Sequence, residues 1–151
     1  MLTTLHLLKS RPHFQFNGLG LFYGAYDLSM LPMARNFTKG PILTPDATSQ
    51  FLKAFLPNRT PEERKDPAIS PFYQDFAGLR LPPALFVCGT QDCLLEDSVM
   101  MALRYQMSGN SAILKLFPGC AHGFNMFPPD LIPAAKECRE TLQKFLLENL
   151  G

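Results

Sequence analysis

The chain has 151 residues, a formal net charge of +1 and four cysteines, with 46% hydrophobic and 18% charged residues. This length fits one domain with a buried core, and the composition excludes an intrinsically disordered chain. The near-zero charge argues against nucleic acid or an anionic membrane as a partner, and no apolar run approaches the roughly 20 residues that cross a bilayer.

The amino-terminal part predicts a helix followed by a buried strand. Leu2, Leu5 and Leu8 recur near helical spacing within residues 1–9, and no capping residue precedes them. The chain therefore has the pattern of one that begins inside a helix. Residues 18–24 form an apolar run without alternation, which is typical of a strand in a parallel sheet covered on both faces.

The middle of the chain combines one helix with long loops. Residues 30–46 hold three prolines and little periodicity. Asp46 is expected to cap a helix over residues 47–55. Its apolar side chains share one face: Phe51, Leu52 and Phe55. The proline-rich residues 57–83 predict a surface excursion within the same domain.

The carboxyl-terminal half predicts two strands, over residues 83–88 and 112–117, each followed by a helix. Asp97, with the serine after it, is expected to cap the first helix, which runs to about Met107. The second helix is expected over residues 129–149. The side chains expected to face the sheet are Val99, Leu103 and Met107 in the first helix, and Leu131, Ala135, Cys138, Leu142, Phe145 and Leu146 in the second.

Three strands thus alternate with about four helices, and this alternation predicts an α/β fold with a parallel sheet and flanking helices. Ligands of such sheets bind beyond the carboxyl ends of the strands. Two side chains with acid–base chemistry stand there: Asp92 follows the strand that ends at Cys88, and His122 follows the strand that ends at Phe117. Tyr26 and Asp27 follow the first strand and point to the same edge, where turn chemistry explains Asp27.

Asp92 and His122 predict two parts of a nucleophilic triad. Adjacent parallel strands lie roughly 5 Å apart, which would bring the carboxylate and the imidazole within reach of each other. A buried aspartate that accepts from an imidazole N–H fixes the tautomer of that ring. The small neighbours Ala121 and Gly123 leave the imidazole room. A turn role for each side chain stays open as the alternative.

The four cysteines, with no secretory leader, predict free buried thiols. A zinc site is an open alternative without support from any C-x-x-C spacing; its ligands would be Cys88, Cys93, Cys120 and His122. We therefore expect no metal and no cofactor. The lack of a leader or a transmembrane segment favours the cytoplasm, although the compartment is otherwise unknown.

Two segments carry a family resemblance: LPPALFVCGTQDCLLED over residues 81–97 and FPGCAHGF over residues 117–124. Together with residues 21–29 and the Ser70–Pro71 pair, they resemble the hormone-sensitive-lipase-like carboxylesterases of the α/β-hydrolase fold, which include arylacetamide deacetylases. The resemblance covers essentially the whole chain but only the carboxyl-terminal half of a family member. It therefore implies that residues 1–151 form a partial α/β-hydrolase domain.

The resemblance implies that Asp92 is the triad acid and His122 the general base of a serine esterase that takes small-molecule esters. Its nucleophile would be a serine in a G-x-S-x-G elbow, with an H-G-G-G oxyanion segment upstream, and neither motif occurs here. Ser111 lies between a helix and a strand and lacks the closing glycine. The chain is therefore expected to be inactive alone. A truncated gene product or a non-catalytic hydrolase-like binding module is the alternative.

Two further expectations follow from the resemblance. The strand over residues 18–24 would pair with the strand that carries the nucleophile, so here it would leave an unprotected edge. We expect this edge to be covered by an amino-terminal companion segment, or to cause self-association or aggregation. Cys93 stands where the family often has proline, and a disulfide between Cys93 and Cys120 at the rim of the site stays open.

Overall fold

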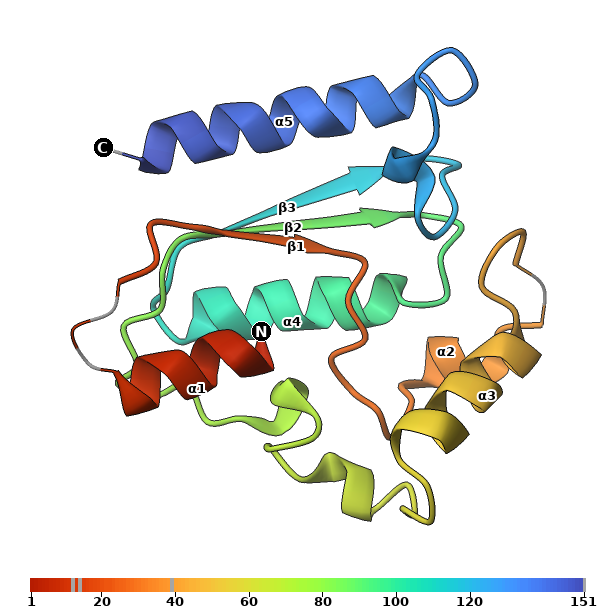
Figure 1. Ribbon diagram of the computed structural model, residues 1–151, viewed down its shortest axis with the longest axis horizontal. Helices are drawn as coiled ribbons and strands as arrows, with labels where there is room; N and C mark the ends of the chain where they lie inside the picture. Colours follow the sequence, from red (N-terminus) through yellow and green to blue (C-terminus); the bar gives the residue numbers. More distant parts are fainter. Residues whose placement is uncertain (12, 14, 39, 151) are drawn as a thin grey trace.

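The computed structural model describes residues 1–11, 13, 15–38 and 40–150. Over this part of the chain, a three-stranded parallel sheet has the order β1-β2-β3, with β1 at Leu19–Phe22, β2 at Ala84–Gly89 and β3 at Ala112–Phe117. Because both pairings are parallel, the three carboxyl ends meet at one edge of the sheet (Figure 1). The predicted parallel α/β fold is confirmed, with β1 shorter than expected.

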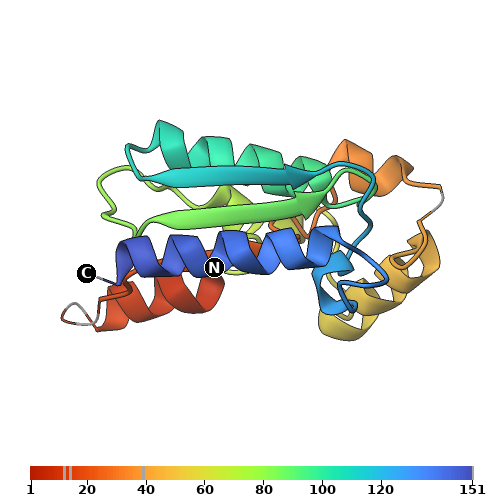
Figure 2. The same cartoon turned by 90° about the horizontal axis from the view of Figure 1, so that it is seen from above.

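Helices cover both faces of the sheet. Helix α5 (Ala134–Asn149) lies on one face, and α1 (Leu2–Ser10) and α4 (Leu95–Met107) lie on the other (Figure 1). The view turned by 90° shows β2 and β3 running side by side in the same direction (Figure 2). Each residue of β2 is buried, which is why this strand is apolar without alternation.

The two faces of β2 belong to two separate cores. Phe86 packs with Tyr26 and Tyr105, at ring-centroid distances of 6.0 and 5.7 Å, in the core shared with α1 and α4. Leu85 and Val87 pack on the opposite side, in the core shared with α5. Burying each of these side chains stabilises the fold by about 1.5–3 kcal/mol.

Between β1 and β2, the described residues form two α-helices and two short 3₁₀-helices. They are α2 (Pro32–Asn36), α3 (Pro45–Phe55), η1 (Glu63–Lys65) and η2 (Pro71–Tyr73). Helix α2 was not predicted, because one turn is too short to create a periodic pattern. Helices α2 and α3 lie beyond the carboxyl ends of the strands (Figure 1).

The cap predicted for α3 is wrong by two positions. Thr44 caps this helix, and its hydroxyl oxygen accepts a hydrogen bond from the backbone N–H of Ala47 at 3.2 Å. Pro45 occupies the first helical position, where a missing N–H costs nothing. Asp46 lies in the first turn instead, where its negative charge favours the helix dipole.

The inward face predicted for α4 is also wrong. Met101, Ala102 and Tyr105 are buried, whereas Leu103 is 46% exposed and Met107 is 86% exposed. Asp97 does not cap the helix, which begins at Leu95 with no side-chain cap. Asp97 is buried instead, on the same side of the helix as Met101 and Tyr105.

Helix α5 begins later than predicted, at Ala134 rather than near Pro129. Pro133 immediately precedes it, and a proline there starts a helix but does not let one run through it. Leu131 therefore lies outside the helix and is 68% exposed. Leu146 is 38% exposed, whereas three of the predicted inward side chains are buried: Ala135, Cys138 and Phe145. A short 3₁₀-helix, η3 (Phe124–Met126), precedes this region.

Within the described residues, β1 pairs with β2 along one side only, so its other side is an open edge. The helices of this same part of the chain are all too short or too polar to serve as a membrane span.

Candidate active site

Asp92 and His122 meet at the carboxyl edge of the sheet. The imidazole Nδ1 of His122 lies 2.9 Å from Oδ2 of Asp92. The Asp92 side chain is fully buried, whereas that of His122 is 25% exposed. The two residues stand 30 positions apart, and they meet because each follows one of two adjacent parallel strands.

Backbone hydrogen bonds hold the two loops together. The N–H of Thr90 donates to the carbonyl of Phe117 at 3.0 Å, and the N–H of Gln91 donates to the carbonyl of Cys120 at 2.9 Å. Gly89 allows this close approach, since a Cβ at that position would collide with the Cys120 carbonyl. The backbone therefore holds together the two loops that carry the carboxylate and the imidazole.

Gly123 sets the direction in which the chain leaves His122. Its φ of +73° lies in the left-handed region, which glycine adopts without steric cost. The chain turns there into η3, so the imidazole stays at the end of β3.

Asp92 has a structural bond besides its contact with the imidazole. Its Oδ1 accepts a hydrogen bond from the N–H of Leu94 at 2.9 Å, while Oδ2 faces His122. The two carboxylate oxygens are therefore distinct, and the Leu94 N–H fixes which one meets the ring.

Asp97 joins α4 to the loop after β1. Its Oδ1 accepts from the N–H groups of Tyr26 and Asp27 at 2.7 and 2.8 Å, while Oδ2 is buried without a partner among the described residues. Burial raises the pKa of Asp97 to about 6. Asp27 itself is buried and accepts from Ser29 and Tyr73, so a turn role explains it as expected.

Two residues that the sequence patterns did not single out adjoin the site: Tyr23 lies against the imidazole, and Asn125 binds Tyr23. The ring of Tyr23 lies 4.5 Å from that of His122 between centroids, with an interplanar angle of 59°. The Tyr23 hydroxyl donates to Oδ1 of Asn125 at 2.8 Å. Tyr23 has a φ of +34°, a conformation that typically costs about 1–3 kcal/mol in a non-glycine residue. The one available signal was its place directly after a strand.

An apolar cavity of about 540 Å³ opens beside His122. Phe22 and Tyr23 line it from the β1 end, and Leu94 lines it from the start of α4. Helix α3 contributes its apolar face: Phe51, Leu52 and Phe55. The three apolar side chains therefore share one face of the helix, as predicted. This face lines a cavity, and Phe51 and Phe55 are 68% and 70% exposed.

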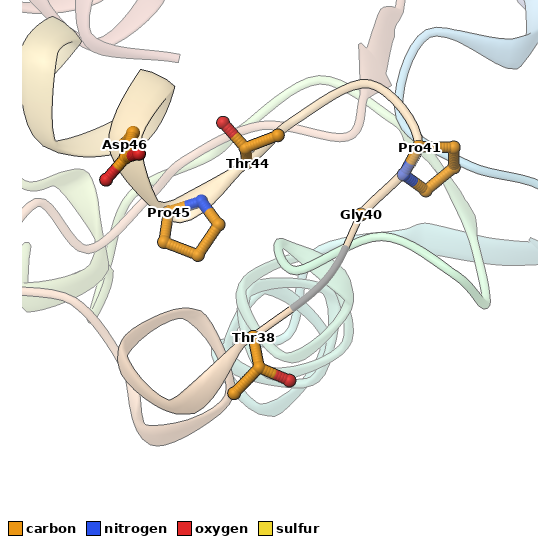
Figure 3. Close-up of a pocket in the computed structure, with 6 residues that line it drawn as sticks. All are labelled: Thr38, Gly40, Pro41, Thr44, Pro45 and Asp46. Atoms are coloured by element: carbon orange, nitrogen blue, oxygen red, sulfur yellow. The ribbon is translucent and has the colours of Figure 1, made fainter.

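A second hollow, of about 580 Å³, lies between the end of α2 and the start of α3 (Figure 3). Thr38, Gly40 and Pro41 line it together with the first residues of α3. No imidazole, thiol or aromatic ring lines it within the described residues, and it is separate from the contact between Asp92 and His122.

All four cysteines are free and buried, so the Cys93–Cys120 disulfide is not formed. Burial raises the pKa of Cys93 and Cys138 to about 11 and that of Cys88 to about 12. These thiols are therefore protonated at neutral pH, and a thiol in that form is a poor nucleophile. Across residues 1–11, 13, 15–38 and 40–150, no group of three or more metal-binding side chains comes together.

The geometry resembles the acid–base half of a nucleophilic triad. Nδ1 of His122 faces a buried carboxylate, which leaves Nε2 to exchange a proton with a reacting group. Within the described part of the chain, no serine, threonine or cysteine hydrogen-bonds to this imidazole.

Comparisons with known proteins agree with the fold. A family model for the alpha/beta hydrolase fold, Abhydrolase_3, matches residues 1–126. An esterase of Acinetobacter venetianus is 27% identical over 140 residues, which cover 91% of this chain and 45% of that protein. An AB hydrolase superfamily protein of Schizosaccharomyces pombe is 27% identical over 105 residues, covering 70% of this chain and 30% of that protein.

Solved structures give the same result. A hormone-sensitive lipase from a metagenome library has a TM-score of 0.83 at 25% identity, over 99% of this chain and 50% of that one. Carboxyl esterase 2 of the fungus Tuber melanosporum has a TM-score of 0.71 at 27% identity, over 82% of this chain and 40% of that one. The chain spans at most about half the length of these relatives. It belongs to the Abhydrolase_3 family of the alpha/beta hydrolase fold, in the lineage of hormone-sensitive-lipase-like esterases.

Proposed function

We propose that this chain supplies the acid and the base of a Ser-His-Asp triad in a carboxylic ester hydrolase. The observation that carries the proposal is the 2.9 Å contact between the buried Asp92 carboxylate and Nδ1 of His122. A carboxylate held away from water beside one ring nitrogen is the arrangement that prepares the other nitrogen for proton transfer.

His122 is the general base in this mechanism. Its Nε2 takes the proton of a serine hydroxyl as the oxygen attacks the ester carbonyl, and then gives that proton to the departing alcohol. A water molecule attacks the acyl-serine in the same way, which releases the carboxylic acid and restores the serine. Asp92 keeps the ring in its Nδ1–H tautomer and stabilises the imidazolium that forms between these steps.

The cavity beside His122 supports esters with an apolar group as substrates. Its walls are mainly aromatic and aliphatic, from Phe22 on β1 to Leu52 on α3. The polar residues in its lining include Asp27, Thr48 and His122. Transfer of an apolar group from water into such a site is favourable by roughly 25 cal/mol for each Å² that is buried. A small ester with an aliphatic or aromatic acyl or alcohol group fits this chemistry better than a charged one.

The nucleophile and the oxyanion donors belong, in this proposal, to polypeptide outside residues 1–151. The chain is a partial hydrolase domain whose missing half supplies a G-x-S-x-G elbow and an H-G-G-G segment. The half-length match to the relatives supports this division.

The test is an ester hydrolysis assay on the chain alone. Wild-type chain and His122→Ala should hydrolyse p-nitrophenyl butyrate at the same background rate, because neither an attacking serine nor an oxyanion hole is present. Turnover that depends on His122 in the chain alone would contradict the proposed division of the site.

A non-catalytic binding module is the second candidate. The observation that favours it is the apolar cavity of about 540 Å³, which residues of this chain alone already form. The coding sequence upstream of Met1 separates the two candidates. If it encodes both missing motifs, the hydrolase proposal is supported; if it encodes neither, the binding module is.

A further inference from the structure

We propose that Tyr23 is a positioning residue for His122: its ring lies against the imidazole at a tilt, and its hydroxyl donates a hydrogen bond to Asn125 on the segment that follows the histidine. The inference rests on the proposed hydrolase function. It adds a third element, β1, to the two strand ends that hold the acid and the base.

Tyr23 is held beside the central strand by its backbone. It follows Phe22, the last residue of β1, and its N–H donates to the carbonyl of Val87 on β2 at 2.7 Å. The backbone of Tyr23 is therefore anchored to the central, fully buried strand. Tyr23 reaches the imidazole from the β1 side, whereas Asp92 reaches it from β2.

The Tyr23 side chain makes two contacts near the imidazole. Its ring lies 4.5 Å from the His122 ring, and its hydroxyl donates to Oδ1 of Asn125 at 2.8 Å. Asn125 lies three residues beyond His122, so the two contacts bracket the turn at Gly123. Asp92 binds one ring nitrogen, and one hydrogen bond alone leaves the ring plane free to tilt about its axis. The Tyr23 ring limits that tilt.

The Tyr23 hydroxyl keeps its proton at neutral pH. Tyr23 is half-buried, and burial raises its pKa, with further contributions from the nearby Cys138, Asp92 and Cys88 groups. The hydroxyl therefore remains a donor to Asn125 throughout the neutral range. The positive φ of Tyr23 is a backbone strain that surrounding contacts must maintain, and such strain concentrates at functional sites.

The experiment measures the His122 ring in the chain itself by NMR, at one fixed pH where the imidazole is neutral. The probe is the exchange rate of the Nδ1 proton with water, together with the ring-current displacement of the carbon-bound ring protons. Tyr23→Leu should remove the displacement and raise the exchange rate by roughly tenfold or more, because the ring opens more often. Tyr23→Phe keeps the ring but loses the Asn125 bond, so it should keep the displacement and exchange faster than wild type.

Two further variants complete the design. Asn125→Ala leaves the tyrosine intact and should give the same Nδ1 proton exchange rate as Tyr23→Phe. It therefore tests the hydrogen bond between Tyr23 and Asn125 even if Tyr23→Leu fails to fold. Tyr73→Phe is the matched control, since its hydroxyl bonds to Asp27 rather than to Asn125, and it should leave the His122 signals unchanged.

Exchange rates within roughly twofold of wild type in folded Tyr23→Leu, or in both Tyr23→Phe and Asn125→Ala, would overturn the inference. This result is distinguishable from failure of the proposed function. The hydrolase proposal fails on His122-dependent turnover, whereas the positioning of the ring is read from His122 without any turnover.

Discussion

At the residue scale, the contact between Asp92 and His122 differs from the surface ion pairs of this chain. Lys136 and Glu140, on α5, lie 3.9 Å apart with both side chains largely exposed, and such a pair typically contributes less than about 1 kcal/mol. Asp92 is fully buried, with each of its oxygens assigned to a different donor. A buried carboxylate without partners is costly, and the contacts with His122 and the Leu94 N–H offset that cost.

Asp92→Asn should reverse the tautomer of His122. The Leu94 N–H requires an oxygen acceptor, so the asparagine must keep its carbonyl there and present its NH₂ group to Nδ1. Nδ1 then becomes the acceptor, and the ring proton moves to Nε2. Imidazole ¹⁵N chemical shifts measure this directly, with the exposed His6 as an internal control. An Nε2–H tautomer in the wild-type chain would contradict the assignment.

The sequence was sufficient to predict that Asp92 and His122 meet, because each follows a strong apolar run and parallel pairing brings the ends of such runs together. It was not sufficient for Tyr23 and Asn125. Their contact occurs where Tyr23 has a positive φ, and the presence of a tyrosine in a sequence does not predict a strained backbone.

At the element scale, buried strands were predictable and helix faces less so. The bounds of β3 agree with the prediction, since an uninterrupted apolar run has few alternatives. The face of α4 was not predictable, because Asp97 has the sequence position of a cap but is buried in the structure. Its partners are the N–H groups of Tyr26 and Asp27, which lie about 70 residues away and leave no local signal.

Asp97 predicts a pH dependence of stability. Burial raises its pKa in the folded state to about 6, whereas in the unfolded chain it titrates near its ordinary value of about 4. Between these values the folded state keeps a proton that the unfolded state has lost. The stability that this proton contributes is therefore complete below about pH 4 and is lost as the pH rises through about 6.

Asp97→Asn should remove the loss of folding stability that occurs as the pH rises through about 6. Relative to this variant, the free energy of unfolding of the wild-type chain should fall between pH 4 and pH 7 by at most about 3 kcal/mol. Urea denaturation across this range measures the difference. Asp130→Asn, at an exposed position, is the control and should keep the wild-type profile. Parallel profiles for the wild type and Asp97→Asn would show that the buried carboxyl does not hold the proton.

At the scale of the whole molecule, the open side of β1 is the feature that most favours association with another chain. Leu19 and Tyr23 direct their N–H groups to β2, so the alternation of a parallel ladder turns those of Gly20 and Phe22 toward the open side. Unpaired strand edges are templates for pairing with another chain.

We therefore expect the isolated chain to associate through this edge or to aggregate, unless a companion segment covers it. Sedimentation velocity over a range of concentrations should show a mass that rises with concentration. A monodisperse monomer at every concentration, with high thermal stability, would mean that β1 needs no partner.

If His122 and Asp92 are the acid–base half of a hydrolase whose nucleophile lies on other polypeptide, joining the two parts should give an active esterase. Ester turnover by this chain expressed together with the coding sequence upstream of Met1 measures this. We expect that longer protein to hydrolyse p-nitrophenyl butyrate, with turnover reduced by roughly 10³-fold or more in His122→Ala. Equal turnover by the longer protein with and without His122 would contradict it.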